Sequence, residues 1–471
     1  MSESIDVDIA IVGSGIAGLC AANAAWESGC RNILVIESEG VVGGSSRLSG
    51  GILMGAGTRL QRAKGIEDSP DDMFHEYMAW NAWRVDAAVV RRFCDEAGHT
   101  VDWLQDLGVP FTGDLILGGD EPQPRCYPVA GSGQGVIDAL HARCRERGID
   151  IALGKRVDRL IVEGNRVVGV AVGDEEVRAA SVVITTGGFG ASPTRLAEHY
   201  PSASATGDWA WYIGADGARG DAFDFASQIG AQITGHDRGL RLLHPNFWRM
   251  VEAYQPAWVV VVNQQGRRFY DEAAPYGIVD DVHRWQGDRA FVIFDDAQLR
   301  FDGERAQYKD PVMGARIKTP NWTPEVVDAQ VAAGAMHRAN SIAELARAIG
   351  VPEANLVGTI ERYNQFCADG EDREFAKAGK FLRPVAVGPF YAALVKPATI
   401  CLTSCGLRID PDGRVLATTG ETVSGLYAGG ECTGGVLGDR YMGSGNSLGN
   451  SATMGRNAGL SAAHAVVRSG R

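Results

Sequence analysis

The sequence predicts an α/β fold built around a dinucleotide-binding unit, and three observations support this prediction. An apolar run near the N-terminus, Ile9–Trp26, contains glycines at the spacing of a strand-to-helix turn. A second apolar run, Ile33–Ile36, is followed directly by Glu37. Far along the chain, "SVVITTGGFG" and "GLYAGGECTGG" are apolar runs that also end in paired glycines. Strands that are distant in sequence and end alike are expected to meet around one ligand.

The N-terminal segment reads as a buried strand, a turn of Gly13-x-Gly15-x-x-Gly18, and an alanine-rich helix ended by Gly29. Glycine permits the tight turn and a close approach of the backbone, and the helix N-terminus attracts a pyrophosphate. Glu37 is suited to accept hydrogen bonds from ribose hydroxyls. A lone glycine motif is a weak signal, but this complete order of elements is a strong one. A plain glycine turn without a nucleotide is therefore the less favoured interpretation.

The segments that follow favour FAD over NAD. The glycine-serine segment Val41–Gly51 is placed to line the flavin end of a long cofactor, "KRVDRLIVEGNRVVGV" reads as a hairpin, and Glu431 offers its carboxylate to a ribityl or ribose hydroxyl. No second strand-glycine-helix unit is visible, and Gly131–Gly135 reads as a loop that starts a helix, so an NADPH domain is not expected. The predicted cofactor-binding residues are Gly13, Gly15, Ala17, Gly18, Glu37, Gly43, Gly44, Ser45, Ser46, Gly50, Gly51, Val157, Gly187, Gly188, Gly430, Glu431, Ser447 and Leu448.

Composition limits the partners. The formal net charge of −13 disfavours nucleic acid and anionic membrane surfaces, which leaves a small-molecule substrate. The nine cysteines are scattered without a CxxC pair, so we expect reduced thiols and no metal site. The run Ile9–Trp26 is long enough to imitate a membrane span, but acidic residues precede it and its glycines fit the turn. With no targeting segment visible, we expect a cytoplasmic protein.

As a set, the segments "GSGIAG", "GGSSRLSGG", "TTGGFG", "VNQQGRRFYDE" and "GLYAGGECTGG" resemble the FAD-dependent fumarate reductase and succinate dehydrogenase flavoprotein superfamily. The resemblance covers nearly the whole chain. It implies a Rossmann-like FAD-binding domain that is interrupted by an α+β cap (substrate) domain, with the substrate held between the cap and the flavin. The implied domains are residues 1–240 and 402–471 for the FAD-binding part and 241–401 for the cap.

The chain departs from fumarate reductases at the residues that carry their chemistry. Their proton-donating arginine corresponds to Tyr276 here, and their histidine in the strand that leaves the cap corresponds to Leu402. Leucine forms no hydrogen bond to a carboxylate, and tyrosine lacks a permanent cation. Succinate is therefore a poor substrate for this arrangement. The position of the flavin-linking histidine of succinate dehydrogenases is Gly44 here, which implies noncovalent FAD.

The loop "YMGSG" and the segment "EAAPYG" are similar to those of 3-ketosteroid dehydrogenases, another branch of the superfamily. In that branch a loop tyrosine and a later glycine N–H hold the ketone oxygen, which implies Tyr441 and Gly445 here. Tyr276 would remove the α-proton as a phenolate while flavin N5 takes the β-hydride, which introduces a C=C bond α,β to the carbonyl. The implied substrate is a cyclic ketone, either a 3-ketosteroid or a cyclohexanone-type ketone such as 4-oxocyclohexanecarboxylate.

Three more residues are expected to bind substrate. Tyr127 is a candidate helper of the Tyr276 phenolate, His244 matches a histidine at the cap edge of the family, and Arg440 would pair with a substrate carboxylate. His244 and Arg440 also have structural interpretations, as a strand end and a solvated cation. The alternative for Tyr276 is a half-buried aromatic ring, and that for Tyr441 with Gly445 is a plain glycine loop around the flavin. Two other functions remain open, namely a fumarate-reductase-like reductase of an activated C=C bond and a non-catalytic FAD-binding redox sensor. The electron acceptor is unknown.

Overall fold

The computed structural model describes residues 5–249, 251, 254–303 and 320–468 of the 471-residue chain. The chain forms two compact units. Unit 1 comprises Met1–Ser204, Gly214–Leu240 and Cys401–Arg471, and unit 2 comprises Ala205–Ile213 and Arg241–Ile400. The segment Ala205–Ile213, which was predicted to lie in the FAD-binding part, clusters with unit 2 because its strand β9 (Trp211–Tyr212) pairs with β15 (Phe390–Thr403).

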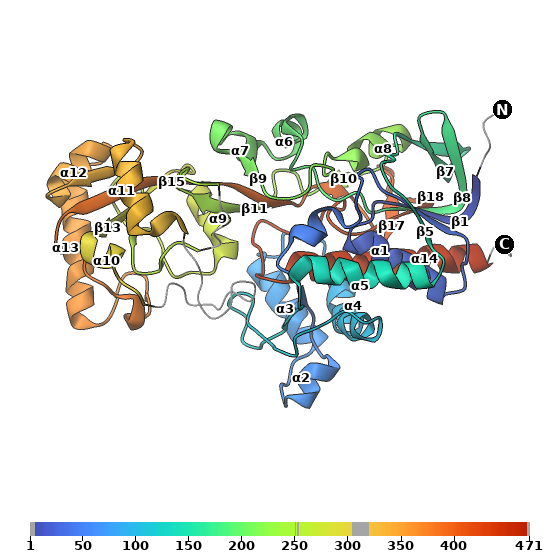
Figure 1. Ribbon diagram of the computed structural model, residues 1–471, viewed down its shortest axis with the longest axis horizontal. Coiled ribbons are helices and arrows are strands. Elements are labelled where there is room, and N and C mark those ends of the chain that lie inside the picture. Colours follow the sequence, from blue (N-terminus) through green and yellow to red (C-terminus); the bar gives the residue numbers. More distant parts are fainter. Residues whose placement is uncertain (1–4, 250, 252–253, 304–319, 469–471) are drawn as a thin grey trace. The chain divides into compact units, whose positions relative to one another are not determined.

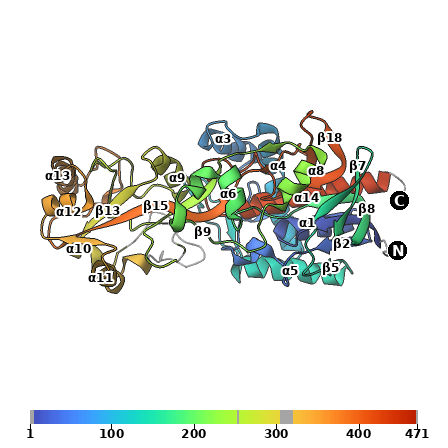
Figure 2. The ribbon, with the colours of Figure 1, turned by 90° about the horizontal axis from the view of Figure 1, so that it is seen from above.

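Unit 1 is built on an eight-stranded sheet with the order β17-β18-β7-β8-β1-β2-β5, in which β6 also pairs with β7 and β18 also pairs with β8. Strands β8, β1, β2 and β5 run parallel, whereas β6, β7 and β8 form an antiparallel meander. Figure 2 labels β2, β5, β7, β8 and β18 of this sheet. The strands are β1 (Ile5–Val12), β2 (Ile33–Ile36), β5 (Asp150–Ala152), β6 (Arg159–Glu163), β7 (Arg166–Val172), β8 (Glu175–Ile184), β17 (Arg414–Leu416) and β18 (Thr422–Ala428). The α/β prediction is confirmed.

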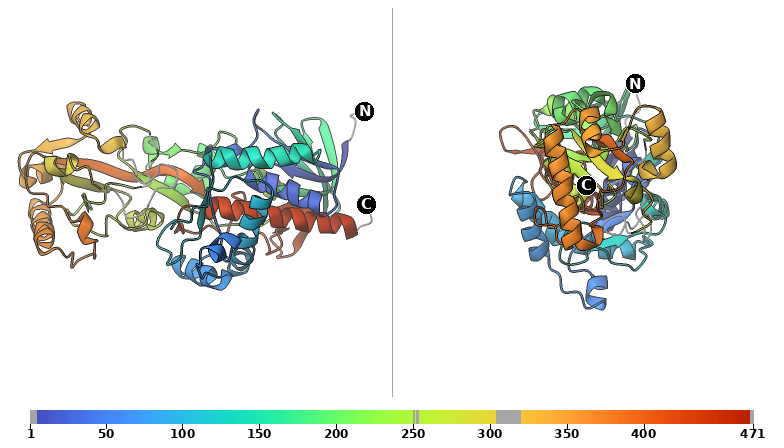
Figure 3. Two further views of the ribbon diagram at one scale, coloured as in Figure 1. Left: turned by 60° about the horizontal axis from the view of Figure 1, so that its bottom comes forward. Right: turned by 90° about the vertical axis from the view of Figure 1, so that its left-hand side faces the viewer.

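Helix α1 (Ile16–Glu27) lies between α5 (Ser132–Glu146) and α14 (Asn446–Arg468) in unit 1 (Figures 1 and 3). Its alanines and glycine are buried, since small side chains let two helices approach its backbone closely. The remaining helices of unit 1 are α2 (Arg59–Ala63), α3 (Pro70–Trp80), α4 (Ala87–Asp106), α6 (Pro193–His199), α7 (Pro201–Ser204), α8 (Asp221–Ile229) and the 3-10 helix η1 (Gly44–Leu48). Two small sheets pair β3 (Ile52–Met54) with β4 (Cys126–Pro128) and β10 (Ile233–Thr234) with β16 (Gly406–Leu407).

Unit 2 contains a six-stranded sheet with the order β11-β15-β13-β12, to which β9 and β14 add by pairing with β15. The strands are β9 (Trp211–Tyr212), β11 (Gly239–His244), β12 (Val260–Val262), β13 (Ala290–Asp295), β14 (His337–Ala339) and β15 (Phe390–Thr403). Its helices are η2 (Gly207–Trp209), α9 (Tyr276–Arg284), α10 (Asp296–Leu299), η3 (Pro320–Trp322), α11 (Pro324–Ala332), α12 (Ile342–Ile349), α13 (Glu353–Asp369) and η4 (Gly379–Phe381). Helices α12 and α13 pack on β12 and β13 and bury one of the apolar clusters of the unit.

Candidate active site

A cleft in unit 1 lies where β1, β2 and β8 end, which is the edge at which parallel sheets bind ligands. It encloses about 740 Å³, part of which is open to solvent. The predicted cofactor residues that line it are Gly13, Gly15, Ala17, Glu37, Gly44, Ser45, Ser46, Val157, Gly187 and Glu431. The predicted residues outside its lining are Gly18, Gly43, Gly50, Gly51, Gly188, Gly430, Ser447 and Leu448.

The lining also includes residues that the sequence analysis missed. Ser14 and Thr185 flank glycines of recognised segments and so carried a signal in the sequence. Lys155 begins the segment that was read as a hairpin, whereas Ala215 and Gly217 belong to a loop without a motif, so only the fold shows that this loop reaches the cleft.

Gly13 forms the tight turn between β1 and α1. Its φ is +107°, and a Cβ at this position would lie 2.4 Å from the carbonyl oxygen of Thr185, so a side chain here would collide with backbone. The Thr185 hydroxyl donates to the carbonyl oxygen of Val12 at 2.9 Å or to that of Gly13 at 3.0 Å, which fixes the turn against the end of β8. The turn therefore presents bare backbone to the cleft at the N-terminus of α1.

Glu37 is held in place by the glycine turn. The backbone N–H and the hydroxyl of Ser14 donate to its Oε2 at 2.8 and 2.6 Å, and the N–H of Glu39 donates to Oε1 at 2.8 Å. The residue is only 5% exposed, yet it lines the cleft. The Ser38 hydroxyl also donates to Oε1, at 3.2 Å, so a ligand hydroxyl would take the place of one of the serine hydroxyls.

Glu431 lies at another part of the cleft, after β18. Its Oε1 accepts hydrogen bonds from the N–H and the hydroxyl of Thr403, both at 2.9 Å. Burial raises the pKa of this carboxyl, and the Thr403 donors oppose that rise. The bare turn at Gly13, the open N-terminus of α1 and the two oriented carboxyl groups fit the pyrophosphate and hydroxyl groups of FAD.

The loop "YMGSG" ends where α14 begins. The N–H of Ser447 donates to the Tyr441 hydroxyl oxygen at 3.0 Å, which places this hydroxyl beside the first turn of the helix. Gly445 has a φ of +94°, and a Cβ there would lie 2.9 Å from the carbonyl carbon of Leu53. Among the described residues, the Gly445 N–H has no acceptor. Unit 1 therefore holds both predicted donors on one short loop.

Residues 118–126 form hydrogen bonds with this loop. The N–H of Ser444 donates to the carbonyl oxygen of Gly118 at 2.8 Å, and the Cys126 thiol lies 2.9 Å from the Ser444 carbonyl oxygen. The buried Glu121 carboxylate accepts the N–H groups of Gly118 and Gly119. Burial raises the pKa of Glu121, against the effect of those donors. The residues that form these contacts carry no motif, so they were not predicted from the sequence.

Arginines surround the residues that precede Tyr441. Asp439 pairs with Arg84 at 3.1 Å and with Arg238 at 3.2 Å, and Arg238 also donates to the carbonyl oxygen of Arg84 at 2.6 Å. Arg440 donates to the carbonyl oxygen of Trp80 at 3.3 Å. Arg84 and Arg238 therefore share one carboxylate in this part of unit 1.

Tyr276 is the first residue of α9 in unit 2 and is 9% exposed. Its ring packs edge-on against the ring of Tyr254, with centroids 5.3 Å apart. It lines a second cavity, of about 340 Å³ and partly open to solvent, that lies wholly in unit 2. The predicted base therefore has direct access to a cavity.

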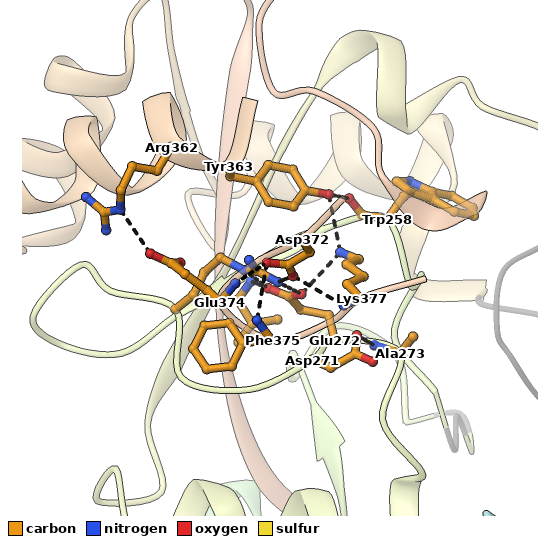
Figure 4. Close-up of polar contacts among 12 residues, drawn as sticks. Trp258, Asp271, Glu272, Ala273, Arg362, Tyr363, Asp372, Glu374, Phe375 and Lys377 are labelled. Carbon is orange, nitrogen blue, oxygen red and sulfur yellow. Dashed lines mark hydrogen bonds and ion pairs between the residues drawn. The ribbon is translucent and has the colours of Figure 1, made fainter. Parts of the chain in front are cut away.

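A buried ion network fixes the turn that precedes Tyr276 (Figure 4). Arg268 donates to Glu272 at 2.8 and 2.9 Å and to Asp372 at 2.9 Å, and Lys377 pairs with Glu272 at 3.2 Å. Burial by itself would raise the pKa of Glu272, but Lys377 and Arg268 together hold that pKa below its ordinary value. The two cations and two carboxylates balance, so the network has a structural role and gives α9 a fixed start.

Tyr127 does not fit its predicted substrate-binding role. Its side chain is buried in the core of unit 1, where its ring packs edge-on against Phe111. Its hydroxyl lies 2.6 Å from the Thr58 hydroxyl, and burial raises its pKa well above the ordinary value. This burial favours a structural role.

Both ring nitrogens of His244 form hydrogen bonds within its own loop. The N–H of Asn246 donates to His244 Nδ1 at 3.2 Å, so Nε2 carries the proton and donates to the carbonyl oxygen of Trp248 at 3.0 Å. Burial lowers the pKa of the ring, against the effect of the Trp248 carbonyl. The neutral ring holds the end of β11, and this arrangement favours the structural interpretation over substrate binding.

The described residues contain neither a membrane-spanning helix nor a cluster of metal ligands. None of the described helices is long and apolar enough to cross a bilayer. Within the same ranges, no group of three or more histidine, cysteine, aspartate or glutamate side chains is arranged to hold a metal ion.

Comparison with known proteins matches residues 8–448 to the family described as an FAD binding domain. A fumarate reductase (cytochrome) from Shewanella frigidimarina is 30% identical over 473 residues, which cover 97% of this chain and 77% of that protein. A 3-oxosteroid 1-dehydrogenase from Mycolicibacterium smegmatis is 25% identical over 581 residues, which cover 98% of both proteins.

A solved structure gives a full-length match. The 3-ketosteroid-delta4-(5alpha)-dehydrogenase from Rhodococcus jostii RHA1, in complex with 4-androstene-3,17-dione, has a TM-score of 0.80 and 26% identity to this chain, with 98% of each chain covered. Sequence and structure thus relate the chain to both fumarate reductases and ketosteroid dehydrogenases, as the motifs predicted.

Proposed function

This chain belongs to the family of the FAD binding domain, and we propose that it is a dehydrogenase that introduces a C=C bond next to the carbonyl of a cyclic ketone. The coarser assignment follows from the family: the protein is an FAD-dependent oxidoreductase of the fumarate reductase and ketosteroid dehydrogenase group, whose members act on C=C bonds.

The observation that carries the proposal is the pair of donors on the "YMGSG" loop. The Ser447 N–H donates to the Tyr441 hydroxyl oxygen, and such a bond strengthens the hydroxyl as a donor in its turn. The Gly445 N–H lies just before α14, where the helix dipole favours negative charge. Together they suit an oxygen that becomes enolate-like, and each donor of this kind contributes about 3 to 4 kcal/mol.

Tyr276 is the proposed base of unit 2. In its ionised form it accepts the α-proton of the ketone, and the electron pair of that C–H bond moves toward the carbonyl oxygen held by Tyr441 and Gly445. The same pair then forms the C=C bond as the β-hydrogen leaves with its electrons. When bound in the unit 1 cleft, FAD supplies the two-electron acceptor for that hydride.

The arginines near Tyr441 support a ketone that also carries a carboxylate. Arg440 directly precedes Tyr441 in the chain, and it is the guanidinium proposed to pair with the substrate. A planar guanidinium suits a carboxylate because two N–H donors match its two oxygens. This favours an oxocyclohexanecarboxylate over a neutral 3-ketosteroid.

A reductase of an activated C=C bond is the second candidate, because the fumarate reductase from Shewanella frigidimarina is more similar in sequence than the 3-oxosteroid 1-dehydrogenase. Tyr276 and Leu402 disfavour it, since neither side chain carries the positive charge that a buried dicarboxylate requires.

Anaerobic mixing of the oxidised holoenzyme with a set of ketones and with succinate distinguishes the ketone dehydrogenase from the reductase. We expect a saturated cyclic ketone, and 4-oxocyclohexanecarboxylate above all, to bleach the flavin absorbance, whereas succinate leaves it unchanged. Bleaching by succinate at a rate comparable to the best ketone would overturn the proposal and support the reductase.

A further inference from the structure

Gln255 in unit 2 has a buried amide with unmet hydrogen-bonding capacity. The residue is 7% exposed, and neither its Nε2 nor its Oε1 has a partner among the described residues. Most buried polar side-chain atoms in folded proteins are paired, because leaving one unpaired costs its lost hydration. An amide left in this state therefore points to a partner that is bound during function.

The cavity that contains Tyr276 is where this amide lies. Gln255 lines the same cavity as Tyr276, and its chain neighbour Tyr254 packs edge-on against the Tyr276 ring. Gln255 and the predicted base thus line one small, partly open cavity within unit 2.

The two charged side chains that line this cavity, Arg241 and Glu272, are already committed to partners. Arg241 pairs with Asp280 at 2.6 Å and with Asp288 at 3.0 Å. Glu272 accepts hydrogen bonds from Arg268, from Lys377 and from the N–H of Val261.

Further titratable groups lie beside the cavity. Tyr254 and Tyr270 line it, and α9 carries Asp280 and the buried His283 one and two turns beyond Tyr276. Burial, assisted by the charge of Arg241, lowers the pKa of His283 to about 3, so this ring is neutral at pH 7 and supplies no positive charge.

We propose that one water molecule in the cavity links Gln255 to Tyr276: the Nε2–H of Gln255 donates to the water, and the water donates to the hydroxyl oxygen of Tyr276 and so stabilises the phenolate. This inference rests on the proposed role of Tyr276 as the base. A tyrosine hydroxyl has an ordinary pKa of about 10, and burial raises that value further unless a donor stabilises the ionised form. Gln255 is a positioning residue that holds this donor, while its Oε1 accepts from a second water molecule.

Three variants test the inference, and the control is a second buried glutamine of unit 2. Gln255→Leu removes the amide, and Gln255→Glu keeps the shape but replaces the donor with a negative charge. Gln298→Leu is the matched control, because the Gln298 amide already donates to the carbonyl oxygens of Trp258 and Arg383 at 3.1 and 2.7 Å.

The first measurement is an ultraviolet titration of tyrosinate absorbance in the holoenzyme, taken as the difference from Tyr276→Phe in each background. We expect the titration of Tyr276 to move upward by about one pH unit in Gln255→Leu, equivalent to a tenfold loss of phenolate, and further in Gln255→Glu. Gln298→Leu should leave it unchanged. An unmoved titration in both Gln255 variants would overturn the inference.

The second measurement compares thermal stability with the pH dependence of flavin reduction by ketone. Gln255→Leu should keep or raise the midpoint of thermal unfolding, because it removes an unpaired buried amide, while the alkaline rise of the rate shifts upward with the titration. Gln298→Leu should lower the midpoint without that shift. A lower midpoint for Gln255→Leu with an unmoved pH profile would show a structural glutamine and reject the inference.

The proposal that Tyr276 is the base and the proposal that Gln255 assists it can be rejected separately. If Tyr276→Phe retains wild-type flavin reduction, the assignment of the base is wrong. If Tyr276→Phe abolishes reduction while the Gln255 variants keep the wild-type titration, only the role of Gln255 is wrong.

Discussion

The Tyr441 hydroxyl oxygen lies 3.0 Å from the backbone nitrogen of Ser447, at the start of α14. The hydroxyl therefore binds at the N-terminus of the helix, where the backbone N–H groups have no partner within the helix. This bond orients the hydroxyl and links the loop to a rigid element. It explains why a glycine-rich loop carries a tyrosine four residues before Gly445.

Replacing Tyr441 by Phe is expected to slow flavin reduction by ketone about 100-fold or more, because one of two oxyanion donors is lost. FAD content should not change, since the hydroxyl is outside the lining of the unit 1 cleft. Stopped-flow absorbance of the flavin measures the rate. Tyr427→Phe, a change of a buried ring on β18, is the control and should react as the wild type does. A loss of less than about tenfold for Tyr441→Phe would contradict the donor role.

Replacing Tyr276 by Phe should preserve FAD binding and nearly abolish flavin reduction by ketone, because the change deletes one hydroxyl and little volume. The control is Tyr391→Phe, since that ring stacks on Phe294 in the core of unit 2. Both variants are compared by single-turnover reduction. A rate for Tyr276→Phe within about tenfold of the wild type, worth roughly 1.4 kcal/mol, would show that Tyr276 is not the base.

Replacing Arg440 by Ala should weaken the binding of a keto acid and leave a neutral cyclic ketone nearly unaffected, because only the acid carries a carboxylate for the guanidinium. We expect a loss of about tenfold or more for 4-oxocyclohexanecarboxylate, measured as the substrate concentration that half-saturates flavin reduction. Arg300→Ala, at an exposed position of unit 2, is the control. Equal losses for the acid and the neutral ketone would instead indicate damage to the loop.

Denaturation of the holoenzyme is expected to release its FAD. The position that carries the flavin-linking histidine in succinate dehydrogenases is Gly44 here, and a hydrogen atom in place of a side chain forms no such bond. After acid precipitation and centrifugation, yellow colour should stay in the supernatant. Colour that remains with the precipitated chain would reject noncovalent binding.

The buried His283 predicts how stability depends on pH. Its folded-state pKa of about 3 lies below the ordinary value of 6.5, because burial and Arg241 both disfavour the charged ring. The unfolded chain therefore binds the additional proton, and the free energy of unfolding falls as the pH drops from about 6.5 toward 3, by up to about 1.4 kcal/mol per pH unit.

His283→Phe should remove most of this loss, since a phenyl ring suits the contacts with Phe269 and Tyr270 and does not titrate. Urea unfolding of the wild type and the variant at pH 7 and pH 5 measures the difference. His464→Gln, at an exposed position of α14, is the control. An equal fall in stability for the wild type and His283→Phe would disprove the assignment to this residue.

The sequence was sufficient to predict those parts of the cofactor cleft that are contiguous in the chain. The glycine turn at Gly13 has the predicted strand before it and the predicted helix after it, because strand, turn and helix geometry are local properties of these residues. Glu37 also follows its strand at the cleft. Loops without a motif, such as that of Gly217, could not be predicted, since their place depends on the path of the whole chain.

What the sequence determined by itself is therefore the fold class and the FAD-binding family, whereas the roles of Tyr276, Tyr441 and Gly445 stay predictions. These follow from local backbone geometry and from side-chain types at fixed spacing. The tertiary structure alone decided which polar groups are committed to partners. Tyr127 and His244 were both predicted from the sequence to bind substrate. In the structure both side chains are buried and form hydrogen bonds within the protein. Gln255 carried no signal in the sequence, and only the packing around it left its amide without a partner beside Tyr276. Whether a polar group is paired depends on neighbours from distant parts of the chain, and those neighbours meet only in the folded protein.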